Sequence, residues 1–180
     1  MVNDVLLLFS HSSHWKDRLF RLSSGCVWSS LDVVLPQEEG EPVYVVGLNP
    51  VTGYVSKVPL SNRIVMADRA CLMTIPDMDP DPVIISLMAQ LNRPFHWRYL
   101  LPERFTPKRH RNMKTWSPAE LVAWAFEDAG MPLFEYNDQR ITLEHFWTLG
   151  ETSNKPVKRE MIKLPPKLAS RLFYPKREAL

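Results

Sequence analysis

Short runs of apolar residues fill the first half of the chain and predict β-strands. They have the length and the β-branched or aromatic content that strands prefer. The turn-prone residues 37–42 separate the second and third runs, so we expect these two to form a β-hairpin. The predicted strands are residues 5–9, 31–35, 43–48, 54–58, 63–66 and 70–74.

Helical patterns are concentrated in the second half of the chain. A helix is predicted after Asp81, which has the residue type of an N-cap and is followed by proline. A second helix is predicted after Ser117, with Pro118 as its first residue and Glu120 as its third, the arrangement of a capping box. Gly130 has the residue type that ends such a helix. Because most strands precede the helices, the order favours an α+β fold over a doubly wound sheet.

Composition indicates an ordinary globular protein. The 180 residues are enough for one substantial core, and 45% hydrophobic with 23% charged residues exclude a largely disordered chain. Cys26 and Cys71 are too few for a disulfide framework, and we expect both to be buried thiols. No stretch approaches the ~20 apolar residues of a membrane span, and the first residues lack a signal-peptide pattern. We therefore expect a protein made in soluble form inside the cell.

Charge is distributed unevenly along the chain. The net charge is +2, but residues 151–180 alone carry eight basic and three acidic residues. We therefore predict a domain over residues 1–150 and a basic, proline-containing arm over residues 151–180 that docks on a partner protein. Residues 1–150 show no nucleic-acid-binding motif, so nucleic acid is not the expected partner.

Two groups of basic residues are candidates for these partner contacts. The first lies in the densest charge run of the body, residues 107–114, for which a solvated loop is the alternative interpretation. The second lies in the arm. The candidates are Lys108, Arg109, Arg111, Lys158, Arg159 and Arg171.

The sequence predicts neither a metal site nor a cofactor. His11, His14 and Cys26 lie near one another, but no fourth ligand follows at a spacing typical of zinc. The alternating aspartates of residues 77–81 lack the glycine and the final glutamate of a calcium loop. We expect those aspartates to form a helix entry.

Five segments, taken in order, resemble the circularly permuted branch of the NlpC/P60 superfamily, which includes YiiX-like proteins and many phage proteins. The resemblance covers roughly residues 3–150. It implies a papain-like α+β fold with a small antiparallel sheet or barrel packed against helices. Thr142, in the last segment, is expected to cap a further helical turn. The segments are Phe9-Ser10 and residues 28–36, 93–97, 118–123 and 140–143.

In that family a cysteine, a histidine and a third polar residue carry out peptide hydrolysis. The histidine takes the proton of the thiol and later protonates the leaving amine. The resemblance aligns the cysteine with Pro118, the histidine with Ser30 and the orienting residue with Gly47. All three positions are therefore vacant, which implies that the mechanism has been lost.

Three other residues could have taken over a catalytic role. Ser117 is next to the expected nucleophile, but its predicted task is to cap its own helix. Cys26 is a lone cysteine in the loop before the histidine strand. His96 stands among aromatic residues, where a packed histidine is the competing interpretation.

We therefore predict a catalytically inactive NlpC/P60-like module that acts through its surface. Because phage members of the branch look closest, we expect a virion component of the tail or baseplate, made in the host cytoplasm and bound to neighbouring subunits through its arm. The alternative is a cysteine or serine hydrolase of peptidoglycan peptides, or an acyl transferase, with a relocated catalytic set. That alternative requires Ser117 or Cys26 within hydrogen-bond reach of a histidine.

Overall fold

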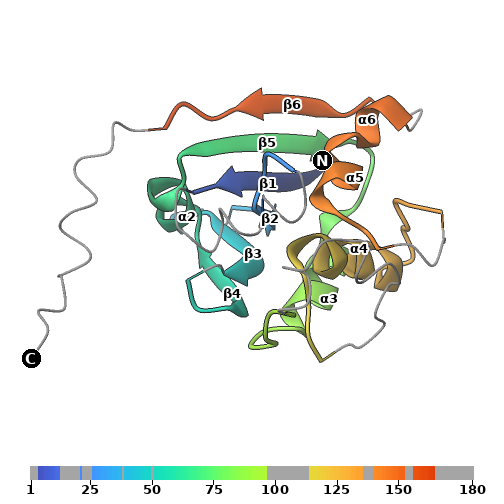
Figure 1. The fold of residues 1–180 in the computed structure, drawn as a ribbon, viewed down its shortest axis with the longest axis horizontal. Coiled ribbons are helices and arrows are strands. Elements are labelled where there is room, and N and C mark those ends of the chain that lie inside the picture. Colours follow the sequence, from blue (N-terminus) through green and yellow to red (C-terminus); the bar gives the residue numbers. More distant parts are fainter. Residues whose placement is uncertain are drawn as a thin grey trace, which may run out of the picture.

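A computed structural model describes residues 4–12, 21, 26–37, 39–49, 51–96, 114–135, 140–152 and 156–164. Its centre is a six-stranded sheet with the order β4-β3-β2-β1-β5-β6, in which every neighbouring pair is antiparallel (Figure 1). The strands are β1 (Val5–His11), β2 (Ser30–Val34), β3 (Tyr44–Asn49), β4 (Tyr54–Pro59), β5 (Arg69–Ile75) and β6 (Lys158–Met161). Antiparallel strands followed by helices confirm the α+β class.

Five of the six predicted strands are confirmed, and so is the hairpin, in which β2 pairs with β3. The prediction for residues 63–66 is wrong, because they belong to helix α2 (Leu60–Met66). In a strand, residues 63 and 65 would share one face. The helix instead buries Arg63 while Val65 is 61% exposed, so the tertiary environment of Arg63 outweighs the local β propensity.

Helices α3 (Pro80–Met88), α4 (Pro118–Asp128), α5 (Leu143–Trp147) and α6 (Leu149–Thr152) follow the fifth strand. Helix α3 begins two residues earlier than predicted, because Asp79 is its N-cap and accepts a hydrogen bond from the backbone N–H of Asp81 at 3.1 Å. The predicted cap at Ser117 is confirmed. Gly130 follows α4 with a φ of 74°, and Thr142 forms a capping box with His145 at the start of α5.

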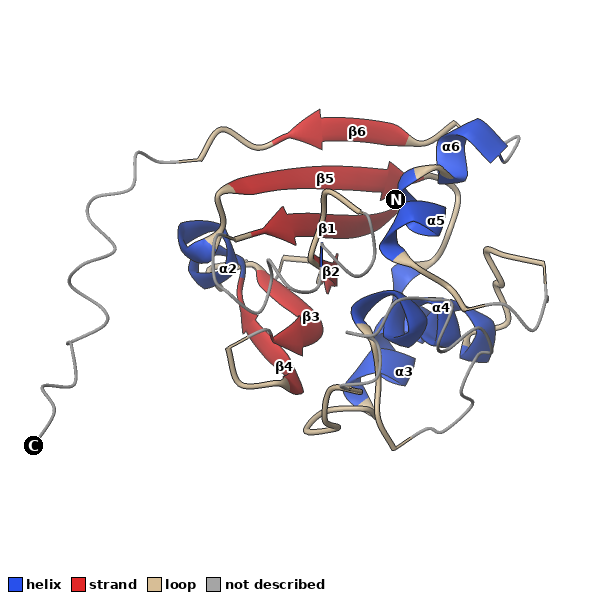
Figure 2. Cartoon of the chain, in the orientation of Figure 1, coloured by secondary structure: helices blue, strands red, loops and turns tan. Residues whose placement is uncertain are grey.

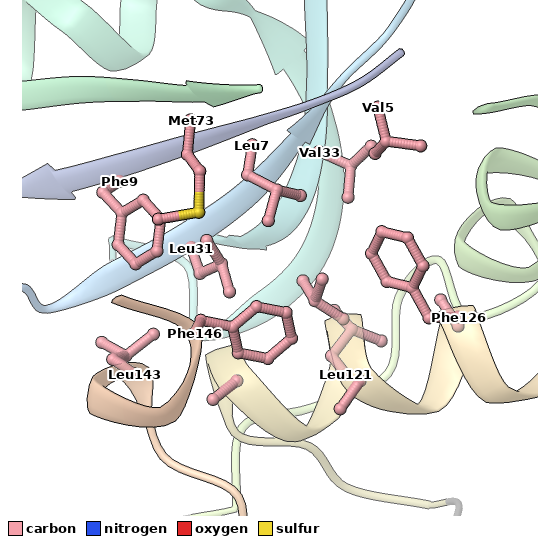
Figure 3. Packing of buried hydrophobic residues seen from close by; sticks show 14 of the residues in the cluster. Val5, Leu7, Phe9, Leu31, Val33, Met73, Leu121, Phe126, Leu143 and Phe146 are labelled. Atoms are coloured by element: carbon pink, nitrogen blue, oxygen red, sulfur yellow. The ribbon is translucent and has the colours of Figure 1, made fainter. Parts of the chain in front are cut away.

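The two faces of the sheet bury separate clusters. The larger cluster lies between the sheet and helices α3, α4 and α5, and Figure 3 shows the ring of Phe126 of α4 directed toward the sheet. The smaller cluster lies on the α2 side of the sheet, and Figure 2 shows α2 well apart from the other helices. Its buried members are Leu8, Val34, Val45, Ala67 and Ala70.

Strand β6 lies within residues 151–180, the segment expected to form an arm. It pairs with β5 and extends the sheet of the main domain by one strand. Residues 165–180 lie outside the described residues. Across the part of the chain that is described, no helix has the length and apolar character needed to cross a membrane.

The packing of α4 allows us to predict how substitutions change the free energy of unfolding. Leu121 is completely buried in the larger cluster, so Leu121→Ala should lower the free energy of unfolding by about 2–5 kcal/mol, measured by urea denaturation. Ile85 on α3 is 69% exposed, and Ile85→Ala should change it by no more than about 0.5 kcal/mol. A similar decrease in the free energy of unfolding for Leu121→Ala and Ile85→Ala would show that α4 is not packed as described.

Candidate functional site

The N-terminus of α4 is the position at which the resemblance expects a nucleophile. Ser117 is only 2% exposed, and its Oγ accepts a hydrogen bond from the backbone N–H of Glu120 at 3.2 Å. Pro118, at the aligned cysteine position, is the first residue of the helix and is also buried. A buried hydroxyl that accepts from its own helix is a structural cap, and the next position has no nucleophilic side chain.

Residues 94–96, which follow α3 in the chain, lie against Trp116 just before the start of α4. The backbone N–H of Trp116 donates to the carbonyl of Pro94 at 3.0 Å, and the N–H of His96 donates to the carbonyl of Trp116 at 2.9 Å. The indole Nε1 of Trp116 also donates to Oε1 of Gln90 at 3.1 Å. These bonds fix the chain just before Ser117.

The structure therefore brings two of the fallback residues, His96 and Ser117, onto neighbouring backbone segments. The contact between the segments is made by backbone groups. Within the described residues, the hydroxyl of Ser117 forms its hydrogen bond with Glu120 and not with the imidazole of His96. The arrangement positions the helix without forming a serine–histidine pair.

Cys26, the third fallback residue, is 3% exposed in the larger cluster. Burial raises the pKa of its thiol to about 12, and a hydrogen bond with the Glu144 carboxylate contributes further to the increase. Nucleophilic cysteines require the opposite environment, in which cations or a helix N-terminus stabilise the thiolate. Cys26 is therefore a buried thiol in its neutral form, as the sequence predicted.

The aligned histidine position, Ser30, is the first residue of strand β2 and is 2% exposed. Its Oγ donates to Oδ2 of Asp32 at 3.4 Å. Leu31 between them belongs to the larger cluster with α4, so Ser30 and Asp32 are directed to the other face of the sheet. The aligned histidine position thus points toward α2, away from the face that α4 covers.

Asp32 forms a buried ion pair with Arg63 of α2. Nε of Arg63 donates to Oδ2 of Asp32 at 2.9 Å, and Nη2 donates to Oδ1 at 2.5 Å. Nη2 also donates to the backbone carbonyl of Leu48 at 2.9 Å. The aspartate is completely buried and the arginine is 6% exposed, so both charges depend on these bonds for compensation.

Gly47, the aligned orienting position, lies directly opposite Asp32 in the β2–β3 pairing. A Cβ atom at this position would lie 2.2 Å from Oδ1 of Asp32. In this backbone residue 47 has no room for a side chain, and like Ser30 it faces α2, so the structure does not bring these two aligned positions together with Pro118 of α4. Sequence reasoning missed this pair, although Asp32 stands as a charged residue in an apolar run and so requires a partner once it is buried.

Glu120 is a second buried carboxyl group, in the first turn of α4. Burial raises its pKa to about 8, while the nearby Arg140 guanidinium acts in the lowering direction. Its Oε1 has no hydrogen-bond partner among the described residues, so this oxygen does not complete the predicted capping box. Glu120 is therefore largely protonated at neutral pH.

Two of the six predicted partner-binding residues, Lys158 and Arg159, lie in strand β6. Lys108, Arg109, Arg111 and Arg171 lie outside the described residues. In β6, Arg159 donates a hydrogen bond to the carbonyl of Trp147 and places its guanidinium 5.1 Å from the centre of that indole ring. Lys158 is exposed and pairs with Glu160.

The structure places His11 at the end of β1 and Asp79 at the cap of α3, whereas His14 lies outside the described residues. No three His, Cys, Asp or Glu side chains come together as a metal-binding group in the part of the chain that the structure describes.

Comparison with known proteins gives a match at the level of the fold. No known protein family and no curated protein matches the sequence. The fold is similar to the crystal structure of the metalloprotein yiiX from Escherichia coli O157:H7, with a TM-score of 0.56 and 14% identity over 75% of this chain and 69% of that one. The match confirms the expected YiiX-like fold. The permutation and a phage origin remain predictions.

The ion pair makes a prediction about stability. Arg63→Met leaves the Asp32 carboxylate buried without its cation, so it should lower the free energy of unfolding by about 3–5 kcal/mol. The exposed Arg69 provides the control, and Arg69→Met should change it by at most about 0.5 kcal/mol. The double variant Asp32→Leu/Arg63→Met removes both charges and should recover much of the loss in urea denaturation. A double variant no more stable than Arg63→Met would contradict this account.

Glu120 makes a prediction about pH dependence. Its native-state pKa of about 8 lies above the ordinary 4.5, so between these values the native state holds a proton that the unfolded state has lost. Stability should therefore fall as the pH rises, by up to about 3 kcal/mol from this group between about pH 5 and pH 8. Glu120→Gln should reduce this loss of unfolding free energy with rising pH, measured by urea denaturation at several pH values. Glu135→Gln, at an exposed position, should leave the loss unchanged. An equal decline in both variants would contradict the raised pKa.

Proposed function

We propose that the chain is a non-catalytic NlpC/P60-like module of the circularly permuted, papain-like type, and that it acts by binding other proteins. The observation that carries this proposal is that the three aligned positions do not meet on one face of the sheet and that each is part of the scaffold. Pro118 begins a capped helix, Ser30 donates to Asp32, and Gly47 makes room for the Asp32 carboxylate.

The residues that could have replaced the catalytic set also have structural roles. Ser117 caps α4, and Cys26 is a buried thiol whose pKa is raised beside a carboxylate. Peptide hydrolysis by this type of site needs a nucleophile and a base within hydrogen-bond reach of each other. The described residues offer no such pair around Ser117, which supports a binding role over the hydrolase or acyl transferase alternative.

We further propose that the bound proteins are subunits of a bacteriophage tail or baseplate. This part of the proposal is supported by the resemblance of the sequence to phage members of the branch and by the excess of basic residues after residue 150. Acidic surfaces on neighbouring subunits are the partners that this charge would favour. Mass spectrometry of purified particles from a phage that encodes the chain should find it in stoichiometric amounts.

The absence of hydrolysis can be tested directly with purified peptidoglycan. We expect the full chain to release no more soluble muropeptides than buffer alone, measured by liquid chromatography with mass spectrometry. The variants Ser117→Ala and Cys26→Ala should give the same background, and an active NlpC/P60 hydrolase serves as the positive control. Release by the wild-type chain that disappears in either variant would overturn the proposal and identify the nucleophile.

A further inference from the structure

The two edges of the sheet are protected differently. At one edge, strand β4 is covered near its start, because Val55 donates to the carbonyl of Arg93 and accepts from the N–H of Asn92, each at 2.9 Å. At the other edge, β6 is the outermost strand (Figure 1). No described segment pairs with its outer side. Edge strands left in this state are templates for pairing with another strand.

The pairing with β5 determines which backbone groups of β6 are available. The N–H of Ile162 donates to the carbonyl of Ala70 at 2.9 Å, so Ile162 faces β5. Because hydrogen-bonding direction alternates along a strand, Glu160 also faces β5, and the N–H and C=O groups of Arg159 and Met161 face outward. An added strand would bond to these two residues.

The side chains of β6 carry a self-complementary charge pattern. Lys158 and Glu160 lie on the same face of the strand, with Nζ and Oε1 2.5 Å apart, and both are exposed. Strands that protect an edge with charge commonly carry lysine alone, which repels a second copy of itself. One positive and one negative residue, spaced by two, can instead each face the opposite charge across an antiparallel pair.

We propose that β6 pairs with β6 of a second copy of this chain, antiparallel and centred on Arg159, to form a continuous twelve-stranded sheet. In this register the outward-facing Arg159 residues exchange backbone hydrogen bonds. Lys158 of each copy then lies opposite Glu160 of the other. Other registers that use the same outward groups do not give both of these opposite-charge pairs.

The remaining side chains of β6 are compatible with the same register. Arg159 is directed to Trp147 of its own chain, where it makes a hydrogen bond and a cation–π contact, so the two central guanidinium groups are held by their own α5 helices. Met161 is 60% exposed, and the register sets it against Val157 of the second copy. The pairing would thus cover one of the most exposed apolar side chains of the structure.

This inference concerns a partner that the proposed function does not specify, and it holds whether or not the chain hydrolyses peptidoglycan. A second copy is the occupant that the charges favour, because the pattern of β6 complements itself.

Sedimentation equilibrium of the full chain tests the proposal. The wild-type protein should show a concentration-dependent mass that approaches twice that of the monomer. Lys158→Glu and Glu160→Lys each place like charges opposite one another, so each variant should dimerise at least about tenfold more weakly. A wild-type protein that remains monomeric at hundreds of micromolar would overturn the proposal.

Mixing the two variants tests the register. In a heterodimer of Lys158→Glu with Glu160→Lys, both glutamates of the first copy face the two lysines of the second. An equimolar mixture should therefore dimerise like the wild type, and so should the double variant Lys158→Glu/Glu160→Lys. Glu41→Lys, in the exposed turn before β3, is the control and should leave dimerisation unchanged. Circular dichroism should show the same fold for all variants. A dimer that persists in both single variants, or a mixture that stays monomeric, would overturn the β6 interface.

Discussion

The buried ion pair between Asp32 and Arg63 links strands β2 and β3 to helix α2. It places two charges in the interior, where neither is stable unless its hydrogen bonds are satisfied. The sheet supplies the hydroxyl of Ser30 and the carbonyl of Leu48 as further partners, and α2 supplies the cation. Gly47 supplies only space. The position of α2 on the sheet and the absence of a side chain at residue 47 are therefore consequences of one requirement.

The same requirement restricts the side chain that residue 47 can carry. A polar side chain at residue 47, as the family resemblance would place there, collides with Oδ1 of Asp32, because even a Cβ atom would lie 2.2 Å away. The buried ion pair and an orienting residue at that position are mutually exclusive in this backbone. A side chain at residue 47 would displace the Asp32 carboxylate and leave Arg63 without its partner. Gly47 and the ion pair therefore depend on each other.

The extent to which the sequence predicts this structure depends on the range of the interactions involved. Strand β1 and the cap at Ser117 were predictable because apolar runs and capping residues act within a few positions. Helix α2 was not, because the burial of Arg63 depends on Asp32, 31 positions away. Strand β6 was missed for a related reason. Its sequence is charged, and its pairing comes from β5 rather than from its own composition.

The two buried carboxyl groups, Asp32 and Glu120, are accommodated in the interior in different ways. Asp32 accepts a bidentate arginine. Glu120, near the positive end of the α4 dipole, still has its pKa raised to about 8, because desolvation outweighs the attraction of Arg140. Ser117 and Glu120 at this helix start both serve the fold, because the serine caps the helix and burial holds the acid in its neutral form. On β6, by contrast, Lys158 and Glu160 are exposed, and no described segment pairs with the outward-facing backbone groups of Arg159 and Met161, so this edge is where the proposed contact with a second chain would form.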